Sequence, residues 1–182
     1  MTGELSQRTI AFLSAPEGTE QIELTQPWDA VVDAGGTPKL ISTKTGEIQA
    51  FHHLDRADRF PIDAMVGDVS AEDFQGLVLP GGVANPDFLR TDPLAVRFVL
   101  DIVAAGIPIA AICHAPWLLI EAGVVNGRTL TSYPSLKTDL RNAGAHWVDD
   151  EVVIDDGLVT SRKPGDLPAF CAAFIKEFQQ YD

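Results

Sequence analysis

The chain has 182 residues, and its 13 Lys and Arg against 26 Asp and Glu give a formal net charge of -13. A hydrophobic content of 46% over this length is enough to build one substantial core, so we expect a single domain spanning residues 1–182. The acidic balance repels phosphate backbones and anionic headgroups, which argues against nucleic-acid groove binding and membrane binding. No segment has transmembrane length and the first residues show no signal pattern, so a cytoplasmic location is expected.

Short apolar runs alternate with helical patterns along the chain, which is typical of a parallel sheet covered by helices on both faces. The predicted strands, in chain order, cover residues 9–13, 39–42, 77–79, 107–112, 129–131, 152–154 and 158–160. The predicted helices cover residues 22–34, 93–105, 116–122, 136–143 and 167–178. Residues 15–18 indicate a turn, residues 80–92 a loop, and residues 52–68 an irregular excursion or a small hairpin. The pattern predicts an α/β fold.

Cys113 follows the most apolar run of the chain and precedes a predicted helix that opens at Ala115 and Pro116. A side chain at such a strand-to-helix turn is exposed at the carboxyl end of the sheet, where open α/β folds bind ligands. The unpaired N–H groups of a helix start would favour the thiolate over the thiol. The alternative is that Cys113 is a small buried hydrophobe, and His114 beside it favours the reactive interpretation.

Several segments resemble the ThiJ/PfpI family. The residues 111–116, AICHAP, are similar to the cysteine elbow of that family, and the residues 77–82, LVLPGG, to its glycine turn. Further matching segments follow the order of the family: residues 20–27, 131–134, 143–149 and 160–168. The resemblance covers nearly the whole chain, and it implies one domain of this type with a flavodoxin-like three-layer sandwich.

The resemblance also implies the other members of the site. Glu23 matches the glutamate whose carboxyl reaches the cysteine, and Asp87 matches the acid that orients the histidine, here one carbon shorter than the usual glutamate. A buried carboxyl beside a thiolate should keep its proton, because two adjacent anions are costly in a low dielectric. The backbone N–H groups of Gly82 and His114 are the oxyanion candidates. Without the resemblance, Glu23 would be interpreted as an exposed helix acid.

These residues together predict an enzyme in which Cys113 attacks an electrophilic carbon, Glu23 handles the adjacent proton, and His114 acts as acid and base. The resemblance implies stress-protective chemistry on small-molecule carbonyl adducts (deglycase or glyoxalase type) or on peptides (intracellular protease type). It implies no cofactor and a homodimer or higher homo-oligomer, in which Asp87 reaches His114 of a neighbouring chain. Phe88 beside Asp87 would then lie at a subunit contact.

Three alternatives remain. Cys113 could be oxidised to sulfenic or sulfinic acid in a redox-sensing or chaperone-like stress protein, with Glu23 stabilising the oxidised form. The chain could also be a structural homologue without turnover. A glutamine amidotransferase is disfavoured, because no His-x-Glu follows Cys113.

The remaining candidate side chains have plainer interpretations. Cys171 shares one helical face with five apolar residues, which predicts core packing. The other three histidines show no metal-ligand spacing, so no metal site is expected. Trp117 and Trp147 are interpreted as core residues, whereas Trp28 could line a pocket or a subunit contact.

Overall fold

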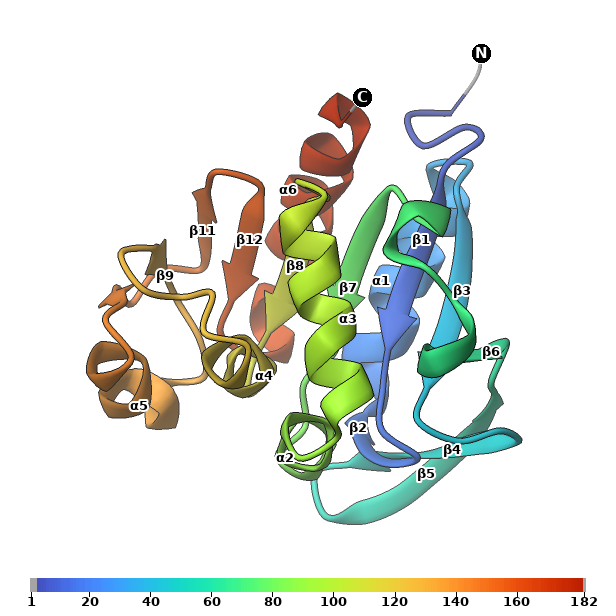
Figure 1. Ribbon diagram of the computed structural model, residues 1–182, viewed down its shortest axis with the longest axis horizontal. Helices are drawn as coiled ribbons and strands as arrows, with labels where there is room; N and C mark the ends of the chain where they lie inside the picture. Colours follow the sequence, from blue (N-terminus) through green and yellow to red (C-terminus); the bar gives the residue numbers. More distant parts are fainter. Residues whose placement is uncertain (1–2, 182) are drawn as a thin grey trace.

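A central sheet organises the computed structural model, which describes residues 3–181. Within these residues the sheet has seven strands in the order β11-β12-β8-β7-β1-β3-β6, all parallel except for the antiparallel pair β11 and β12 (Figure 1). Its strands are β1 (Thr9–Leu13), β3 (Thr37–Ser42), β6 (Ala64–Met65), β7 (Gly76–Leu79), β8 (Ile109–Ile112), β11 (Val152–Asp155) and β12 (Leu158–Ser161). The predicted mostly parallel α/β sandwich is therefore confirmed.

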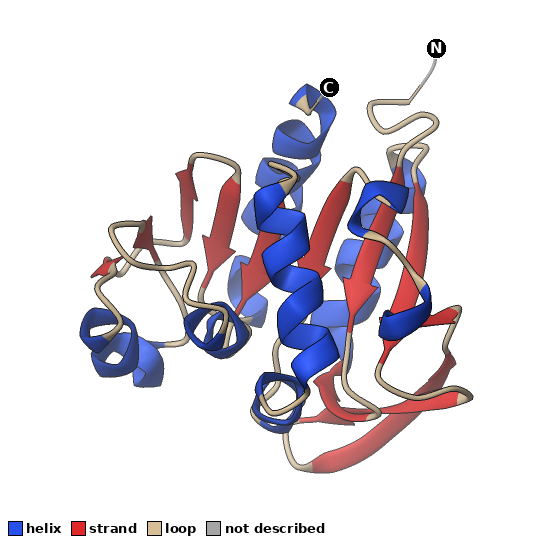
Figure 2. Cartoon of the chain, in the orientation of Figure 1, coloured by secondary structure: helices blue, strands red, loops and turns tan. Residues whose placement is uncertain are grey.

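Helices cover both faces of this sheet (Figure 2). One layer contains α1 (Gln21–Asp33) and α6 (Leu167–Gln180), which pack against each other, and the opposite layer contains α2 (Ala84–Arg90), α3 (Pro93–Ala104) and α4 (Pro116–Glu121). The remaining helices are α5 (Lys137–Asn142) and four single 3-10 turns, η1 (Val66–Asp68), η2 (Ala71–Asp73), η3 (Pro134–Leu136) and η4 (Pro164–Asp166).

Two smaller sheets flank the central one. The strands β2 (Glu17–Glu20), β4 (Glu47–His52) and β5 (Asp55–Pro61) form one, and β9 (Thr129–Leu130) with β10 (His146–Trp147) forms the other. The first of these crosses the end of the molecule at which β1, β7 and β8 finish, next to α2 (Figure 1). It therefore supplies one wall above the carboxyl ends of the central strands.

Alternation along the strands divides the core into two halves. In β1, Ala11 and Leu13 pack into the cluster beneath α3 and α4, whereas Ile10 and Phe12 pack into the cluster beneath α1 and α6. All four side chains are fully buried, as expected for a parallel strand covered on both faces. Three phenylalanines of α6 lie in the second cluster with their rings edge-on or tilted to one another: Phe170, Phe174 and Phe178.

Some sequence predictions need correction. Residues 84–90 form α2 instead of a loop, and Glu17 already belongs to β2 instead of a turn. Of the two forms predicted for residues 52–68, the hairpin is confirmed for 52–61, which belong to the antiparallel pair that begins at Glu47, whereas β6 and η1 occupy 64–68. Pro27 lies inside α1, where it has no N–H to donate to the carbonyl of Glu23.

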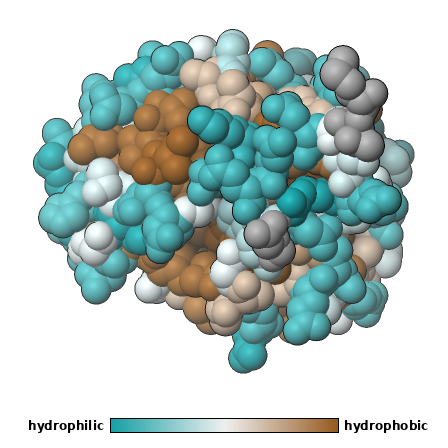
Figure 3. Space-filling view, turned by 90° about the horizontal axis from the view of Figure 1, so that it is seen from above, coloured by the Kyte–Doolittle hydropathy of each residue, from teal (hydrophilic) through white to brown (hydrophobic). Residues whose placement is uncertain are grey.

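Within residues 3–181, no helix combines the length and apolar character that crossing a bilayer requires. Hydrophilic residues cover most of the face at the amino ends of the central strands, with apolar residues gathered in separate patches (Figure 3).

Candidate active site

Cys113 occupies a strained turn directly after β8. Its φ of 64° lies in the left-handed region, which few residues other than glycine adopt and which often marks a functional site. Two hydrogen bonds hold this backbone: Cys113 N–H donates to the Ser161 carbonyl (3.1 Å), and Tyr133 N–H donates to the Cys113 carbonyl (2.8 Å). The turn directs the side chain above the carboxyl ends of the strands.

The ring of His114 lies beside the sulfur. Its Nδ1 is 3.1 Å from Cys113 Sγ, and its Nε2 is 3.3 Å from Ser135 Oγ. Tyr133 stacks on the ring at 4.7 Å and Trp117 meets it edge-on at 5.3 Å. Burial lowers the pKa of His114, so the ring is neutral at pH 7 and one nitrogen can accept a proton.

Glu23, from the first turns of α1, is fully buried against the same sulfur. Burial, with a further contribution from the nearby Glu20, raises its pKa to about 8. Sγ of Cys113 and the N–H groups of Gly81 and Gly82 oppose this rise, although neither carboxyl oxygen reaches ordinary hydrogen-bond geometry. The carboxyl group therefore keeps its proton at neutral pH and can act as an acid.

The two glycines after β7 make this arrangement possible. A Cβ at Gly81 would collide with Glu23 Oε2 and lie 2.6 Å from Cys113 Cβ, so no side chain fits between them. Gly82 has a φ of 86°, and a Cβ there would meet the Gly18 carbonyl and the Glu20 nitrogen. The glycine turn is therefore a steric requirement of the site.

Opposing effects act on the Cys113 thiol. Burial raises its pKa, and the negative form of Glu23 raises it further, whereas the N–H groups of Gly82 and His114 lower it. The sequence-based expectation of a thiolate favoured by helix N–H groups omitted the burial. In the structure, His114 Nδ1 is placed to accept the thiol proton directly, which would leave Cys113 as the nucleophilic thiolate. The same two N–H groups could then stabilise an oxyanion next to the sulfur.

Asp87 lies on α2, exposed, at the same cavity as His114. Among the described residues, no hydrogen bond or ion pair joins its carboxyl to His114. Ser135 contacts the ring nitrogen instead. Sequence reasoning missed Ser135, because a serine 21 residues downstream of the histidine carries no motif of its own. The sequence feature that could have indicated Ser135 was its position directly after residues 131–134, a segment that resembles the family.

These residues line a cavity of about 960 Å³. Its floor is formed by Glu23, Gly82, Cys113 and His114, and its walls by β2, the β4–β5 turn, α2 and Tyr133. Trp117 also lines it, so this side chain is half-buried at the cavity instead of fully in the core. Trp28 is also half-buried, but it does not line the cavity and packs on the core residue Phe12, with ring centres 5.2 Å apart.

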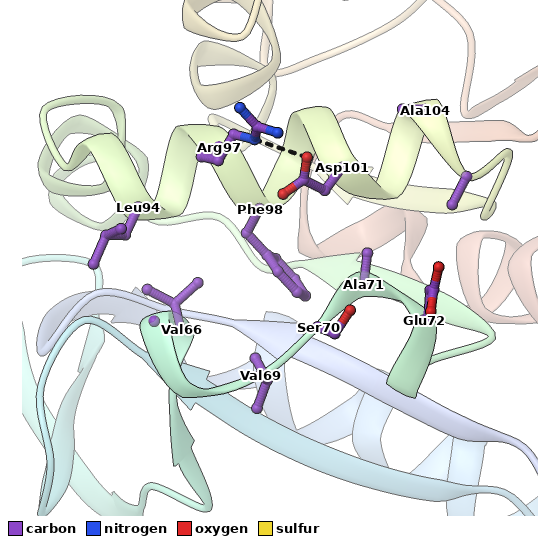
Figure 4. Close-up of a pocket in the computed structure, with 12 residues that line it drawn as sticks. Val66, Val69, Ser70, Ala71, Glu72, Leu94, Arg97, Phe98, Asp101 and Ala104 are labelled. Atoms are coloured by element: carbon purple, nitrogen blue, oxygen red, sulfur yellow. Dashed lines mark hydrogen bonds and ion pairs between the residues drawn. The ribbon is translucent and has the colours of Figure 1, made fainter.

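A second hollow, of about 560 Å³, lies between α3 and residues 66–72 (Figure 4). Its charged side chains are Glu72 and the paired Arg97 and Asp101, joined at 2.8 Å. Among the described residues, neither cysteine nor histidine lines it, so it offers no comparable nucleophile. No group of three His, Cys, Asp or Glu side chains in residues 3–181 gathers as a metal-ligand set.

Cys171 provides an internal reference for the reactivity of Cys113. It is buried in α6 among phenylalanines, and burial raises its pKa to about 12. Because Cys113 has His114 as a proton acceptor and a cavity for the reagent, iodoacetamide at pH 7.5 should alkylate it at least about tenfold faster. Peptide mass mapping after short exposures measures both rates. Equal or faster labelling of Cys171 would exclude Cys113 as the reactive thiol.

Replacement of Glu23 by glutamine tests the carboxyl next to the sulfur. The wild-type carboxyl of Glu23 ionises near pH 8, and its negative charge then opposes ionisation of Cys113. Above pH 8, Cys113 should therefore be alkylated faster in Glu23→Gln than in wild type. The alkylation rate of Cys113 between pH 6 and 10 checks this. Glu72→Gln, an equal change of charge in the other hollow, is the control. A Glu23→Gln profile identical to wild type would contradict the proposed contact.

Comparison with known proteins identifies the family of the chain. The model of the DJ-1/PfpI family matches residues 8–177. A deglycase of Pyrococcus horikoshii is 40% identical over 167 residues, which cover 92% of this chain and 97% of the relative. Protein/nucleic acid deglycase 2 of Escherichia coli is 43% identical over 164 residues, covering 90% and 93%. The crystal structure of Drosophila melanogaster DJ-1beta superposes with a TM-score of 0.86 at 30% identity, covering 96% and 91%. The chain therefore belongs to the DJ-1/PfpI family.

Proposed function

We propose that this protein is a cysteine-dependent enzyme that removes carbonyl adducts formed by α-oxoaldehydes. The contact of Cys113 Sγ with His114 Nδ1 at 3.1 Å, on a strained turn at the floor of a cavity, is the observation that carries the proposal. Two relatives named as deglycases, each matching about nine-tenths of the chain, support this substrate class. Peptide hydrolysis is the other reaction that the same nucleophile could perform.

The residues account for each step of adduct removal. The Cys113 proton passes to His114, and the sulfur bonds to the carbinol carbon of the adduct as the carbon–nitrogen bond breaks. The amine leaves with the proton from His114, and a hemithioacetal of Cys113 remains. Glu23 first gives its proton to the neighbouring carbonyl oxygen, and its carboxylate then takes the proton of the carbinol carbon, which forms an enediol. Glu23 returns that proton to the neighbouring carbon and takes one from the hydroxyl beside the sulfur, which gives a thioester, and water then releases the 2-hydroxy acid and the thiol. The N–H groups of Gly82 and His114 hold the oxyanion.

A redox function is the second candidate, and a specific contact favours it. The protonated Glu23 and the N–H groups of Gly82 and His114 surround the sulfur, so they could donate hydrogen bonds to a sulfinate formed there. Oxidation of Cys113 would end adduct removal, because the sulfur would no longer be nucleophilic.

Three substrates separate these functions. Purified protein is supplied with methylglyoxal, a methylglyoxal-modified peptide and a fluorogenic peptide amide. We expect release of 2-hydroxy acid and free amine from the modified peptide, and at least about a thousandfold loss in Cys113→Ser. Hydrolysis of the peptide amide alone would instead show a protease. Absence of turnover on all three, with peroxide-driven sulfinic acid at Cys113, would favour the redox function.

The protein is also proposed to act as a homo-oligomer with a shared site. Asp87 is exposed at the cavity mouth without an in-chain contact to His114, and its neighbours Val83 and Phe88 are 56% and 47% exposed. Apolar side chains beside an unpaired acid suit a subunit contact better than solvent.

Subunit mixing tests this arrangement. Asp87→Ala and Cys113→Ser should each be weakly active or inactive alone, because each lacks one member of every site. After exchange, mixed oligomers should recover up to about a quarter to a half of wild-type activity, at interfaces that pair an intact acid with an intact Cys113. Light scattering measures the oligomeric state and confirms exchange. A fully active monomer, or no recovery after proven exchange, would exclude the shared site.

A further inference from the structure

The charged lining of the Cys113 cavity has one sign. Its charged side chains are Glu17, Glu20 and Asp87, and the protonated Glu23 lies at its floor. No Lys or Arg among the described residues lines the cavity or pairs with these four side chains. Glu17 and Asp87 are exposed at the mouth, whereas Glu20 is 8% exposed and Glu23 is fully buried. Within low-dielectric walls, such an arrangement focuses a negative potential toward the sulfur.

Two features separate this cavity from an ordinary acidic surface. Glu23 is a buried carboxyl at the cavity floor, and its oxygens lack a hydrogen bond of ordinary geometry. The walls also carry four aromatic rings, those of Phe51, Phe88, Trp117 and Tyr133. Aromatic faces attract cations through their quadrupoles, so rings and acids act in the same direction here.

One of these rings, that of Trp117, already lies next to a cation of the protein. The guanidinium of Arg90 lies 5.7 Å from the ring centre of Trp117 and is paired with Glu121 at 3.7 Å. Arg90 does not line the cavity, and among the described residues no ion pair joins it to Glu17, Glu20 or Asp87. A positively charged ligand would supply a cationic partner for these acids.

We propose that the cavity selects electrophiles carried on a cationic group, an ammonium or guanidinium, over neutral and anionic ones, and that Glu17 is a specificity-determining residue. This inference rests on the proposed function in so far as Cys113 is the reacting group. It adds that the carrier of the adduct is recognised by its charge. Glu17 is the informative acid, because Glu20 is tied to His53 N–H at 2.9 Å and influences Glu23, whereas Glu17 makes neither interaction.

Charged thiol reagents test the selection without requiring turnover. The cationic probe is 2-(trimethylammonio)ethyl methanethiosulfonate, and the anionic probe is 2-sulfonatoethyl methanethiosulfonate. In both, the Cys113 thiolate attacks the sulfenyl sulfur, a disulfide forms, and methanesulfinate leaves. Peptide mass mapping measures the rate at which each probe modifies Cys113. The ratio of the cationic to the anionic rate at Cys113 is then divided by the same ratio of rates measured with free 2-mercaptoethanol.

We expect this normalised ratio to be at least about tenfold at 0.15 M salt, where charges beyond about 8 Å are screened. Glu17→Gln should lower it by about threefold, the effect typical of one partly exposed charge. Glu72→Gln, which changes the net charge equally but lies in the hollow of Figure 4, should leave it unchanged. A normalised ratio near one, or a ratio unaffected by Glu17→Gln, would overturn the proposal.

A turnover experiment separates this inference from the proposed function. Methylglyoxal hemithioacetals of 2-(trimethylammonio)ethanethiol and of 3-mercaptopropionate present the same reacting carbon on a cationic and an anionic carrier. Faster turnover of the trimethylammonio adduct, with the difference reduced in Glu17→Gln, supports both ideas. Absence of turnover for both adducts contradicts the proposed function alone, because the reagent ratio at Cys113 is measured independently.

Discussion

The left-handed backbone at Cys113 is the constraint on which the rest of the site depends. A non-glycine residue in this conformation costs about 1 kcal/mol or more, so neighbouring structure must hold it. The two hydrogen bonds that do so involve Ser161 and Tyr133, which lie far downstream in β12 and in the segment after β9. The elbow is therefore a product of the assembled sheet, and the local sequence alone cannot form it.

Burial sets the chemistry that this turn presents. Glu23 and Cys113 share a space from which water is largely excluded, so each side chain favours its neutral form. A negative charge on either one also opposes ionisation of the other. His114, also neutral, then becomes the group that can accept a proton when the sulfur reacts. The site stays uncharged at its floor, while carboxyl groups gather higher on its walls.

The sequence predicted the parts of the fold whose pattern is strong. Buried strands such as β1 and β8 are continuous apolar runs, and the hairpin of β11 and β12 is signalled by its Asp-Gly turn. Helix α2 was missed because it contains Pro86, which is tolerated there as it lies in the first turn. Strand β2 is short and polar, so no alternation indicated it. At the site, the resemblance placed Glu23 and Gly82 beside Cys113. The contact of Ser135 depends on tertiary packing that no local pattern encodes.

The glycine turn has a consequence for how the activity of this fold could diversify. With Gly81 closed by Glu23 and Cys113, and Gly82 closed by the Gly18 carbonyl, the floor has no room for even a methyl group. The rim is different: Leu54 is 92% exposed and comes from the β4–β5 turn, outside the central sheet and apart from Val83 and Phe88 of the proposed subunit contact. Substitution of Leu54 therefore changes what enters the cavity without disturbing the groups that react. A library intended to alter substrate range should begin at this position and leave both glycines untouched.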